Sequence, residues 1–162
     1  MKRVVILGRG AAGKSTLARQ LGEIAGLPVV ELDKIFWRSG LFPTPRVEWI
    51  QLQQSLIEKA EWVLDGDLGP YDAVEVRLRA ADTIILLNFS LLRCALHAFR
   101  RAPERADFWR WVLLYRRESV PRLTDAISRN APNATVHILR TPKAVTEFLA
   151  DVGGQSRCGA VS

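Results

Sequence analysis

The segment that most constrains the fold is an eight-residue run near the start of the chain, Gly8-Arg9-Gly10-Ala11-Ala12-Gly13-Lys14-Ser15. It matches the pattern G-x-x-x-x-G-K-[ST] of a phosphate-binding loop, or P-loop. The apolar run Val4-Val5-Ile6-Leu7 before it is typical of a buried parallel strand. Apolar residues at helical spacing follow it, namely Leu17, Ala18, Leu21, Ile24 and Ala25. Strand, glycine-rich loop and helix are the context in which this motif binds nucleotides.

Each part of the loop has an expected role. Glycines let the backbone N–H groups point into one concavity, and the positive end of the following helix adds to the attraction for phosphate. Lys14 is expected to reach the β- and γ-phosphates, and the Ser15 hydroxyl to hold Mg²⁺. The candidate nucleotide-binding residues are Gly8, Arg9, Gly10, Ala11, Ala12, Gly13, Lys14, Ser15 and Thr16. The alternative is a glycine turn that only joins a strand to a helix.

Length and composition predict one globular domain. The chain has 162 residues, of which 48% are apolar and 25% charged, ordinary values for a domain with a proper core. The start of the chain has too few apolar residues for a signal peptide, and no run approaches the ~18 apolar residues of a membrane span. Two cysteines without a pairing pattern, Cys94 and Cys158, are typical of the reducing cytoplasm. We therefore expect a cytoplasmic protein that is not associated with a membrane.

The positive charge of the chain is concentrated in one stretch. The formal net charge is +6, and the stretch from Arg93 to Arg129 contains nine arginines against four acidic residues. Three interpretations are open: a solvated helical face, a surface that faces the anions of the phosphate site, or a nucleic-acid-binding surface. No sequence pattern of a nucleic-acid reader accompanies the arginines, so a nucleic-acid partner is the least favoured.

Short apolar runs alternate with helical patterns along the chain. Strands are expected at residues 4–7, 29–32, 62–64, 83–87 and 135–139, and helices at about 14–26, 45–60, 90–101, 108–130 and 142–152. This alternation predicts an α/β fold with a parallel sheet covered by helices on both faces, and a ligand at the carboxyl ends of the strands. The domain is expected to span residues 1–152, and residues 153–162 to form a disordered tail.

Two connecting segments are less regular. Residues 36–43 are aromatic and rich in chain breakers, which favours a loop, and Thr44-Pro45 is expected to start the next helix with Thr44 as its N-cap. Residues 67–81 combine loop chemistry at Gly69-Pro70 with a possible short helix after it.

Five residues lie at or just beyond the ends of the expected strands, namely Gly8, Asp33, Asp65, Asn88 and Arg140. In a parallel sheet these positions lie along one edge. Two carboxylates beside a triphosphate have distinct uses, since Asp65 can orient hydrated Mg²⁺ and Asp33 can accept a proton from an attacking hydroxyl. The alternative is that each aspartate only caps a turn.

The residues that follow Asp33 are candidates for the acceptor site. Phe36 and Trp37 can line an acceptor pocket, and Arg38 can pair with an acidic group of the acceptor. Equally, the aromatic side chains can pack under the helix that starts at Pro45.

Three further arginines, Arg100, Arg101 and Arg105, surround the break at Ala102-Pro103. A mobile segment that carries arginines over the phosphates can stabilise phosphoryl transfer and exclude water. The alternative is a basic hairpin that faces solvent. Of the two histidines, His97 lies in the preceding helix and His137 inside the last strand, and both are interpreted as structural.

Beyond single motifs, a series of segments resembles a known family. The series comprises the P-loop, Leu27-Pro28 to Leu32-Asp33, Phe36-Trp37-Arg38, Pro43-Thr44-Pro45-Arg46 with Trp49, Trp62-Val63-Leu64-Asp65-Gly66, Ala81-Asp82-Thr83-Ile84 and Leu139-Arg140-Thr141-Pro142. Over about residues 2–150 the chain resembles the bacterial adenylate-kinase-like P-loop proteins that are often labelled DNA topology modulation proteins.

The resemblance implies a nucleoside-monophosphate-kinase-type fold with strand order 2-3-1-4-5, a lid at about residues 100–110, and ATP with Mg²⁺ as the phosphoryl donor. It further implies that Arg140, Thr141 and Pro142 lie against adenine, that Asp65 contacts Mg²⁺ through water, and that Asp33 faces the acceptor.

The chain departs from the family pattern in three places. Asp67-Leu68 follows Asp65-Gly66 where the family has Asn-Tyr, Asn88 ends the fourth strand where the family has Asp, and the lid between Arg101 and Phe108 is short. Nucleoside-monophosphate kinases proper place an arginine soon after Asp-Gly to hold the acceptor phosphate, whereas the first arginine here is Arg77, so AMP does not follow as the acceptor. Asp67 and Arg77 are the candidate substrate contacts in this region.

The resulting hypothesis is an ATP-dependent kinase that acts on a small-molecule acceptor, with Lys14, Asp33 and the lid arginines as its catalytic residues. The alternative is a nucleotide-binding regulator with slow ATPase activity that acts through a protein or DNA partner. The sequence indicates no oligomeric state.

Overall fold

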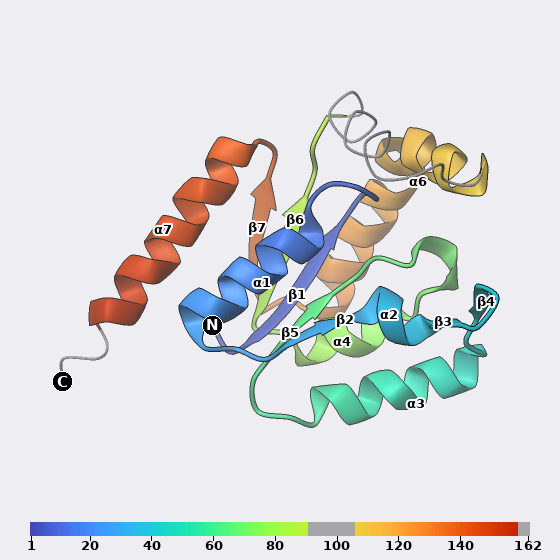
Figure 1. Ribbon diagram of the computed structural model, residues 1–162, viewed down its shortest axis with the longest axis horizontal. Coiled ribbons are helices and arrows are strands. Elements are labelled where there is room, and N and C mark those ends of the chain that lie inside the picture. Colours follow the sequence, from blue (N-terminus) through green and yellow to red (C-terminus); the bar gives the residue numbers. More distant parts are fainter. Residues whose placement is uncertain (91–105, 159–162) are drawn as a thin grey trace.

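A five-stranded parallel sheet forms the centre of the protein (Figure 1). The computed structural model describes residues 1–90 and 106–158, with side chains other than those of 106–114, 116 and 155–158. The strands of the sheet are β1 (Arg3–Gly8), β2 (Val29–Glu31), β5 (Trp62–Asp65), β6 (Thr83–Leu87) and β7 (Thr135–Leu139). They lie in the order β2-β5-β1-β6-β7. Counted along the chain among these five strands, the order is 2-3-1-4-5, so the predicted α/β fold is confirmed.

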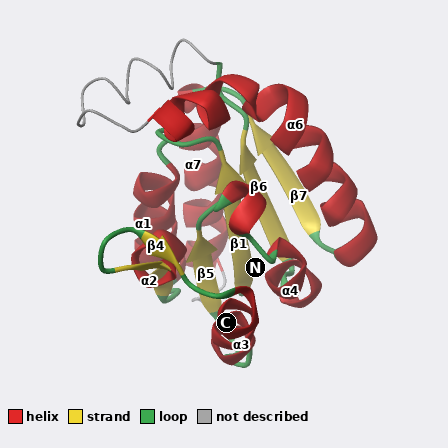
Figure 2. Ribbon diagram, turned by 90° about the vertical axis from the view of Figure 1, so that its right-hand side faces the viewer, coloured by secondary structure: helices red, strands yellow, loops and turns green. Residues whose placement is uncertain are grey.

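Helices cover both faces of this sheet (Figure 2). On one face lie α1 (Lys14–Ala25) and α7 (Pro142–Cys158); on the other lie α3 (Arg46–Ile57), α4 (Val74–Ala80) and α6 (Ala106–Asn130). The strand β1 serves both layers because successive side chains point to opposite faces. Val4 and Ile6 pack with the α1 and α7 side chains, whereas Val5 and Leu7 pack on the opposite side. This double burial explains why the run before the P-loop is continuously apolar.

The segment expected as a loop at residues 36–43 has regular structure instead. The helix α2 (Leu32–Phe36) leads into a hairpin of β3 (Trp37–Arg38) and β4 (Phe42–Pro43). Gly40 and Leu41 both have positive φ, at 80° and 60°, and this allows the two strands to pair across a short connection. The loop prediction was wrong because a hairpin with two-residue strands leaves no periodic pattern in the sequence.

Thr44 closes the base of this hairpin and does not cap the next helix. Its hydroxyl donates a hydrogen bond to the Phe36 carbonyl at 2.5 Å, and its N–H donates to the same oxygen at 3.1 Å. Pro45 occupies the N-cap position of α3, without a side-chain hydrogen bond. The predicted N-cap is therefore corrected.

At the other end of the chain, α7 extends through Cys158. Residues 153–158, expected in a disordered tail, therefore continue the helix. Contact with α1 accounts for part of the difference. Val152 is buried, and the backbone of Gly153 lies against Ile24 of α1. A β-carbon added at residue 153 would be 3.6 Å from Ile24 Cγ2. Between residues 67 and 81, where a loop and a short helix were expected, the chain forms the short 3-10 helix η1 (Gly69–Tyr71) and then α4.

Candidate active site

The P-loop connects β1 to α1 at the carboxyl edge of the sheet, with a backbone that requires glycine at two positions. Gly8 has a φ of +148°, and a β-carbon there would lie 2.7 Å from the Leu87 carbonyl oxygen. Gly13 has a φ of +86° and is the N-cap of α1. No side chain caps α1, and its first turn contains no acidic residue. The N–H groups of this turn are thus left for an anion.

Lys14 lies within the loop. Its side chain is buried, and Nζ donates a hydrogen bond to the Arg9 carbonyl oxygen at 3.2 Å. This contact holds the ammonium group close to the loop N–H groups. Burial raises the pKa values of two carboxyl groups, Asp33 and Asp65, and the charge of Lys14 opposes this rise at both of them. Lys14 therefore stands where phosphate charge and the two predicted carboxylates would meet.

Asp65 ends β5 and forms a hydrogen bond with the Ser15 side chain. Burial raises the pKa of Asp65, although Lys14 and the Ser15 hydrogen bond act in the opposite direction. Its Oδ1 atom is buried and has no hydrogen-bond partner among the described residues. Protein sites for Mg²⁺ use one or two carboxylates together with substrate phosphates. The Ser15 hydroxyl and the unpartnered Asp65 oxygen fit such a site, either directly or through water.

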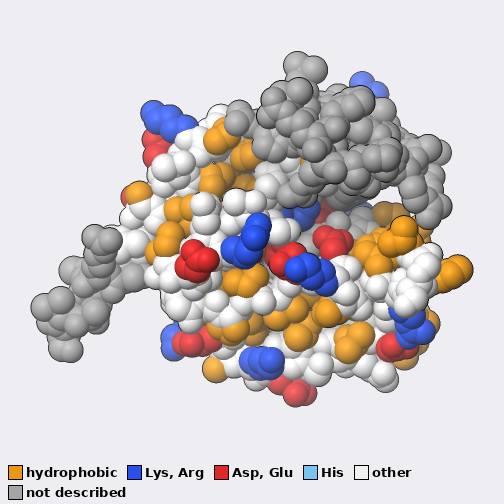
Figure 3. Space-filling view, in the orientation of Figure 1, with side chains coloured by type: hydrophobic (Ala, Val, Ile, Leu, Met, Phe, Trp, Pro, Cys, Tyr) orange, Lys and Arg blue, Asp and Glu red, His pale blue; other side chains and the backbone are white. Residues whose placement is uncertain are grey.

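Asp33 lies in the first turn of α2, two residues beyond β2. Although Asp33 is exposed, the surrounding protein partly desolvates its carboxyl group and raises its pKa. Lys14 opposes this shift, and the carboxylates of Asp65, Asp67 and Asp72 add to it. A carboxylate with a raised pKa is a stronger base than an ordinary aspartate, which suits it to accept a proton. Figure 3, in the orientation of Figure 1, shows acidic and basic side chains beside one another near the middle of the molecular surface that faces the viewer.

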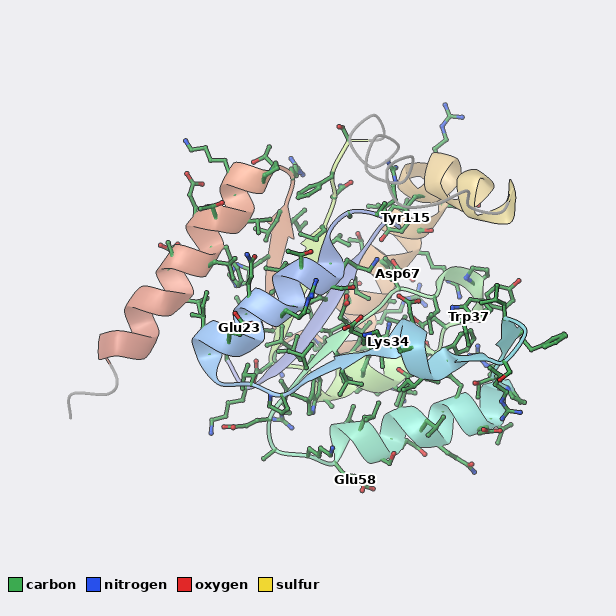
Figure 4. The ribbon with its side chains drawn as sticks, viewed as in Figure 1. Glu23, Lys34, Trp37, Glu58, Asp67 and Tyr115 are labelled. Atoms are coloured by element: carbon green, nitrogen blue, oxygen red, sulfur yellow. The ribbon has the colours of Figure 1, made fainter. Side chains whose placement is uncertain are left out.

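Asp67 joins the site to the long helix α6. The Tyr115 hydroxyl donates a hydrogen bond to Asp67 Oδ2 at 2.7 Å, and the Gly69 N–H donates to Oδ1 at 3.1 Å. In Figure 4, Tyr115 and Asp67 lie close together, whereas Glu58 is on the distant end of α3. Both carboxylate oxygens of Asp67 thus have protein partners.

Arg9 extends from the P-loop to the same tyrosine. Its guanidinium carbon lies 5.5 Å from the centre of the Tyr115 ring, within cation–π range. The sequence pointed to Arg9 only as a member of the loop, and it gave no sign of Tyr115. Residues 9 and 115 are far apart in the sequence, so only the fold reveals their contact.

The aromatic residues after Asp33 are largely structural. Phe36 is buried and packs edge-on against Trp49 of α3, with ring centres 5.0 Å apart. Trp37 contacts Phe36 and Tyr71, at 4.8 and 5.9 Å between ring centres. Arg38 is paired with Glu48 of α3. Phe36 therefore packs against α3 instead of lining an acceptor pocket. Arg38 is paired with a carboxylate of the protein itself.

Arg77 requires a correction. Its side chain is 0% exposed, and its Nη atoms donate to both carboxylate oxygens of Asp72, to Gln53 Oε1 and to the Gly66 carbonyl. The Nη donors are therefore engaged in hydrogen bonds within the protein. Arg77 is therefore a structural residue beneath the site, and the expected substrate contact is withdrawn.

The remaining residues of the edge lie between β6, β7 and α7. The Asn88 N–H donates to the Leu139 carbonyl at 2.9 Å, and its buried Oδ1 has no partner among the described residues. Thr141 caps α7, since its Oγ1 accepts the Ala144 N–H at 3.2 Å. Arg140 is exposed and Pro142 is the first residue of α7. This loop thus lies at the expected edge.

Several predictions fall on residues outside the described part of the chain. These are the lid arginines Arg100, Arg101 and Arg105, together with His97 and Cys94. His137, interpreted as structural, packs against Phe148 of α7 with ring centres 4.8 Å apart and the rings tilted by 57°. Within residues 1–90 and 106–158, no group of three or more His, Cys, Asp or Glu is arranged to hold a metal ion. The same residues contain no helix with the length and hydropathy of a membrane span.

Comparisons with known proteins give structural matches only. No family model matches the chain, and no curated protein matches its sequence. The shikimate kinase from Acinetobacter baumannii in complex with shikimate is 14% identical, with a TM-score of 0.69 over 100% of this chain and 96% of that one. A gluconokinase from Sinorhizobium meliloti is 15% identical, with a TM-score of 0.58 over 98% and 97%. The shikimate kinase from Bacteroides thetaiotaomicron is 16% identical, with a TM-score of 0.57 over 96% and 98%. At these identities the likeness shows a shared fold over nearly the whole chain.

Proposed function

We propose that this protein is an ATP-dependent kinase that transfers the γ-phosphoryl group of Mg·ATP to a hydroxyl group of a small-molecule acceptor. One observation carries the proposal: Lys14 of the P-loop acts electrostatically on both Asp33 and Asp65, and Asp65 is hydrogen-bonded to Ser15. Donor-binding groups, a metal-binding pair and a basic carboxylate are thus gathered at one edge of the sheet. The structural similarity to a shikimate kinase and a gluconokinase supports this reaction class.

On the donor side, the loop N–H groups and Lys14 bind the β- and γ-phosphates. Ser15 and Asp65 would hold Mg²⁺, which supplies positive charge between these phosphates. The loop of Arg140, Thr141 and Pro142 is proposed to lie against adenine, because it follows β7 at the same edge of the sheet. A lid that carries Arg100, Arg101 and Arg105 would add charge stabilisation and exclude water during transfer.

On the acceptor side, Asp33 accepts the proton. The acceptor oxygen attacks the γ-phosphorus while the bond from that phosphorus to the bridging oxygen breaks. The electron pair of the broken bond remains on ADP, and the hydroxyl proton moves to the Asp33 carboxylate. The raised pKa of Asp33 favours this transfer.

The acceptor is proposed to be a small hydroxylated compound and not a nucleoside monophosphate. A nucleoside-monophosphate kinase needs an arginine soon after Asp65-Gly66 for the acceptor phosphate, and the first one, Arg77, is buried and engaged. Shikimate, which is bound in one of the similar structures, and gluconate, implied by the name gluconokinase, are small hydroxy acids. They define the first compounds to test.

The test is ADP release from Mg·ATP in the presence of nucleosides, nucleotides, sugars and small hydroxy acids. Stimulation by one class, with the compound gaining a phosphoryl group, supports the kinase. Slow turnover that no compound stimulates, with ATP still bound, would instead favour a nucleotide-binding regulator that acts through a protein or DNA partner.

A further inference from the structure

Arg9 is a fully buried residue of the P-loop. Its side chain is 1% exposed, yet its Nε and Nη1 atoms are buried without a hydrogen-bond partner in the described structure. Among the described residues, no acidic side chain forms an ion pair with Arg9. The guanidinium is thus a buried cation with two unused donors.

This arrangement is costly for the protein alone. Arginine keeps its charge when buried, because its pKa is too high for it to lose a proton. An uncompensated buried charge costs several kcal/mol, whereas a cation–π contact returns about 0.5–2 kcal/mol. The contact with the Tyr115 ring therefore offsets only part of the cost. An anion that enters the site and accepts a hydrogen bond from either of the free donors would offset more of it.

The described contacts of Arg9 divide between its backbone and its side chain. The Arg9 carbonyl oxygen accepts a hydrogen bond from the Lys14 ammonium group, which belongs to the proposed phosphate-binding loop. The Arg9 side chain instead lies on Tyr115, whose hydroxyl is bound to Asp67. Asp67 in turn acts electrostatically on Asp33, the proposed base for the acceptor. Arg9 is thereby connected with the acceptor side of the site.

We propose that Arg9 binds a carboxylate or phosphate group of the acceptor through Nε or Nη1, which places an anionic acceptor beside Asp33. This inference rests on the proposed kinase function. The charge of the guanidinium strengthens a hydrogen bond to an oxygen of such a group, and the buried location makes the recognition selective. A neutral analogue would leave the guanidinium unpaired and would bind at least tenfold more weakly.

Arginine side-chain nuclear magnetic resonance tests the anion site directly, with Mg·ADP bound to the full chain. Acetate and inorganic phosphate are titrated separately at constant ionic strength while the Nε–H signals are followed. Arg9→Met identifies the Arg9 signal, and the exposed Arg79 provides an internal control. We expect the Arg9 signal to shift with saturation at a concentration at least tenfold below that needed for Arg79. The more effective anion tells whether the site prefers a carboxylate or a phosphate.

Three outcomes would overturn the proposal. In the first, the Arg9 signal responds to the anions no more strongly than the Arg79 signal. In the second, it shifts when ADP binds and does not change further with either anion. In the third, Arg9→Met weakens Mg·ATP binding tenfold. The last two would make Arg9 a donor-binding residue. Arg9→Lys, which keeps the charge but lacks the Nε and Nη1 donors of the guanidinium, serves if Arg9→Met does not fold.

A paired acceptor assay separates this proposal from the kinase itself. Each hydroxy acid is compared with its methyl ester, which keeps the hydroxyl groups but removes the charge. Preference for the acid by at least tenfold, lost in Arg9→Met, supports the proposal. Equal use of acid and ester contradicts the proposed role of Arg9 but leaves the kinase function intact. The absence of turnover with any compound contradicts the kinase function and, with it, an acceptor role for Arg9.

Discussion

Arg77 and Asp72 form a two-point ion pair in the interior, with 2.8 Å between Nη1 and Oδ1 and 2.6 Å between Nη2 and Oδ2. Burial alone would raise the pKa of Asp72, but the charge and hydrogen bonds of Arg77, with further hydrogen bonds from Trp49 and the Leu68 N–H, hold it below the ordinary value. Arg77 also reaches Gln53 of α3 and the Gly66 carbonyl after β5. The pair thus ties two helices to the segment that carries Asp65 and Asp67.

Arg77→Met is therefore expected to destabilise the fold. Removal of one partner leaves the Asp72 charge buried, which costs about 3–5 kcal/mol, measured by urea unfolding. The matched control is Arg79→Met on the exposed side of α4, with an expected change within about 0.5 kcal/mol. Unchanged stability of Arg77→Met together with a raised KM for the acceptor would restore Arg77 as a substrate residue.

Lys14→Ala tests the P-loop. Loss of this buried ammonium removes a donor to the phosphates, and we expect turnover to fall by about 10²–10³-fold while the circular dichroism spectrum is retained. Lys59→Ala, at an exposed position beyond α3, should leave turnover unchanged. Equal turnover of Lys14→Ala and the wild type would refute the assignment of the loop.

Asp33→Asn tests the proposed base. Asparagine cannot accept the proton, so kcat is expected to fall by about 10²–10⁴-fold while the Kd for Mg·ATP, measured by calorimetry, changes little. Glu58→Gln at the end of α3, far from the site in Figure 4, is the control. Equal losses in kcat and in ATP affinity would place Asp33 on the donor side.

The pH dependence of kcat/KM gives a second measure of Asp33. Only its deprotonated form accepts a proton, so the rate falls as the pH drops through its pKa. Because desolvation raises this pKa, the acid limb is expected above the range of about pH 4 that is ordinary for aspartate. A limb that stays in the ordinary range would contradict this role.

Asp65→Asn is expected to separate stability from activity. Burial raises the pKa of Asp65 in the folded state, so at neutral pH its charge is less favourable in the folded than in the unfolded chain. The neutral amide should raise Tm, measured by calorimetry without Mg²⁺, while Mg²⁺-dependent turnover falls. A lower Tm would show that the Asp65 charge stabilises the fold.

The sequence was sufficient for the parts of the site that depend on local patterns. The P-loop spacing, with the apolar run before Gly8, predicted the strand, loop and helix, and the polar residues after each strand predicted the edge at which Asp33 and Asp65 lie. Both inferences need only chain-local signals and the parallel direction of the strands.

The parts that depend on contacts between distant residues were not accessible from the sequence. Arg9 and Arg77 look alike in the sequence, but one is a buried cation without a carboxylate partner among the described residues and the other is paired with Asp72. Tyr115 lies far along the chain from both Arg9 and Asp67, and no short-range pattern marks it. Thr44 was assigned to the wrong role because its side chain can either accept a hydrogen bond from a helix N–H as an N-cap or donate one to a carbonyl, and the hairpin places the Phe36 carbonyl within reach of its hydroxyl.

The most direct test of the central claim is mass spectrometry of the acceptor after incubation with Mg·ATP and either the wild-type protein or Asp33→Asn. The account predicts that a small hydroxy acid gains one phosphoryl group, in step with ADP release, with the wild-type protein and far more slowly with Asp33→Asn. ATP hydrolysis to ADP and free phosphate without a phosphorylated acceptor, at the same rate in both proteins, would contradict it.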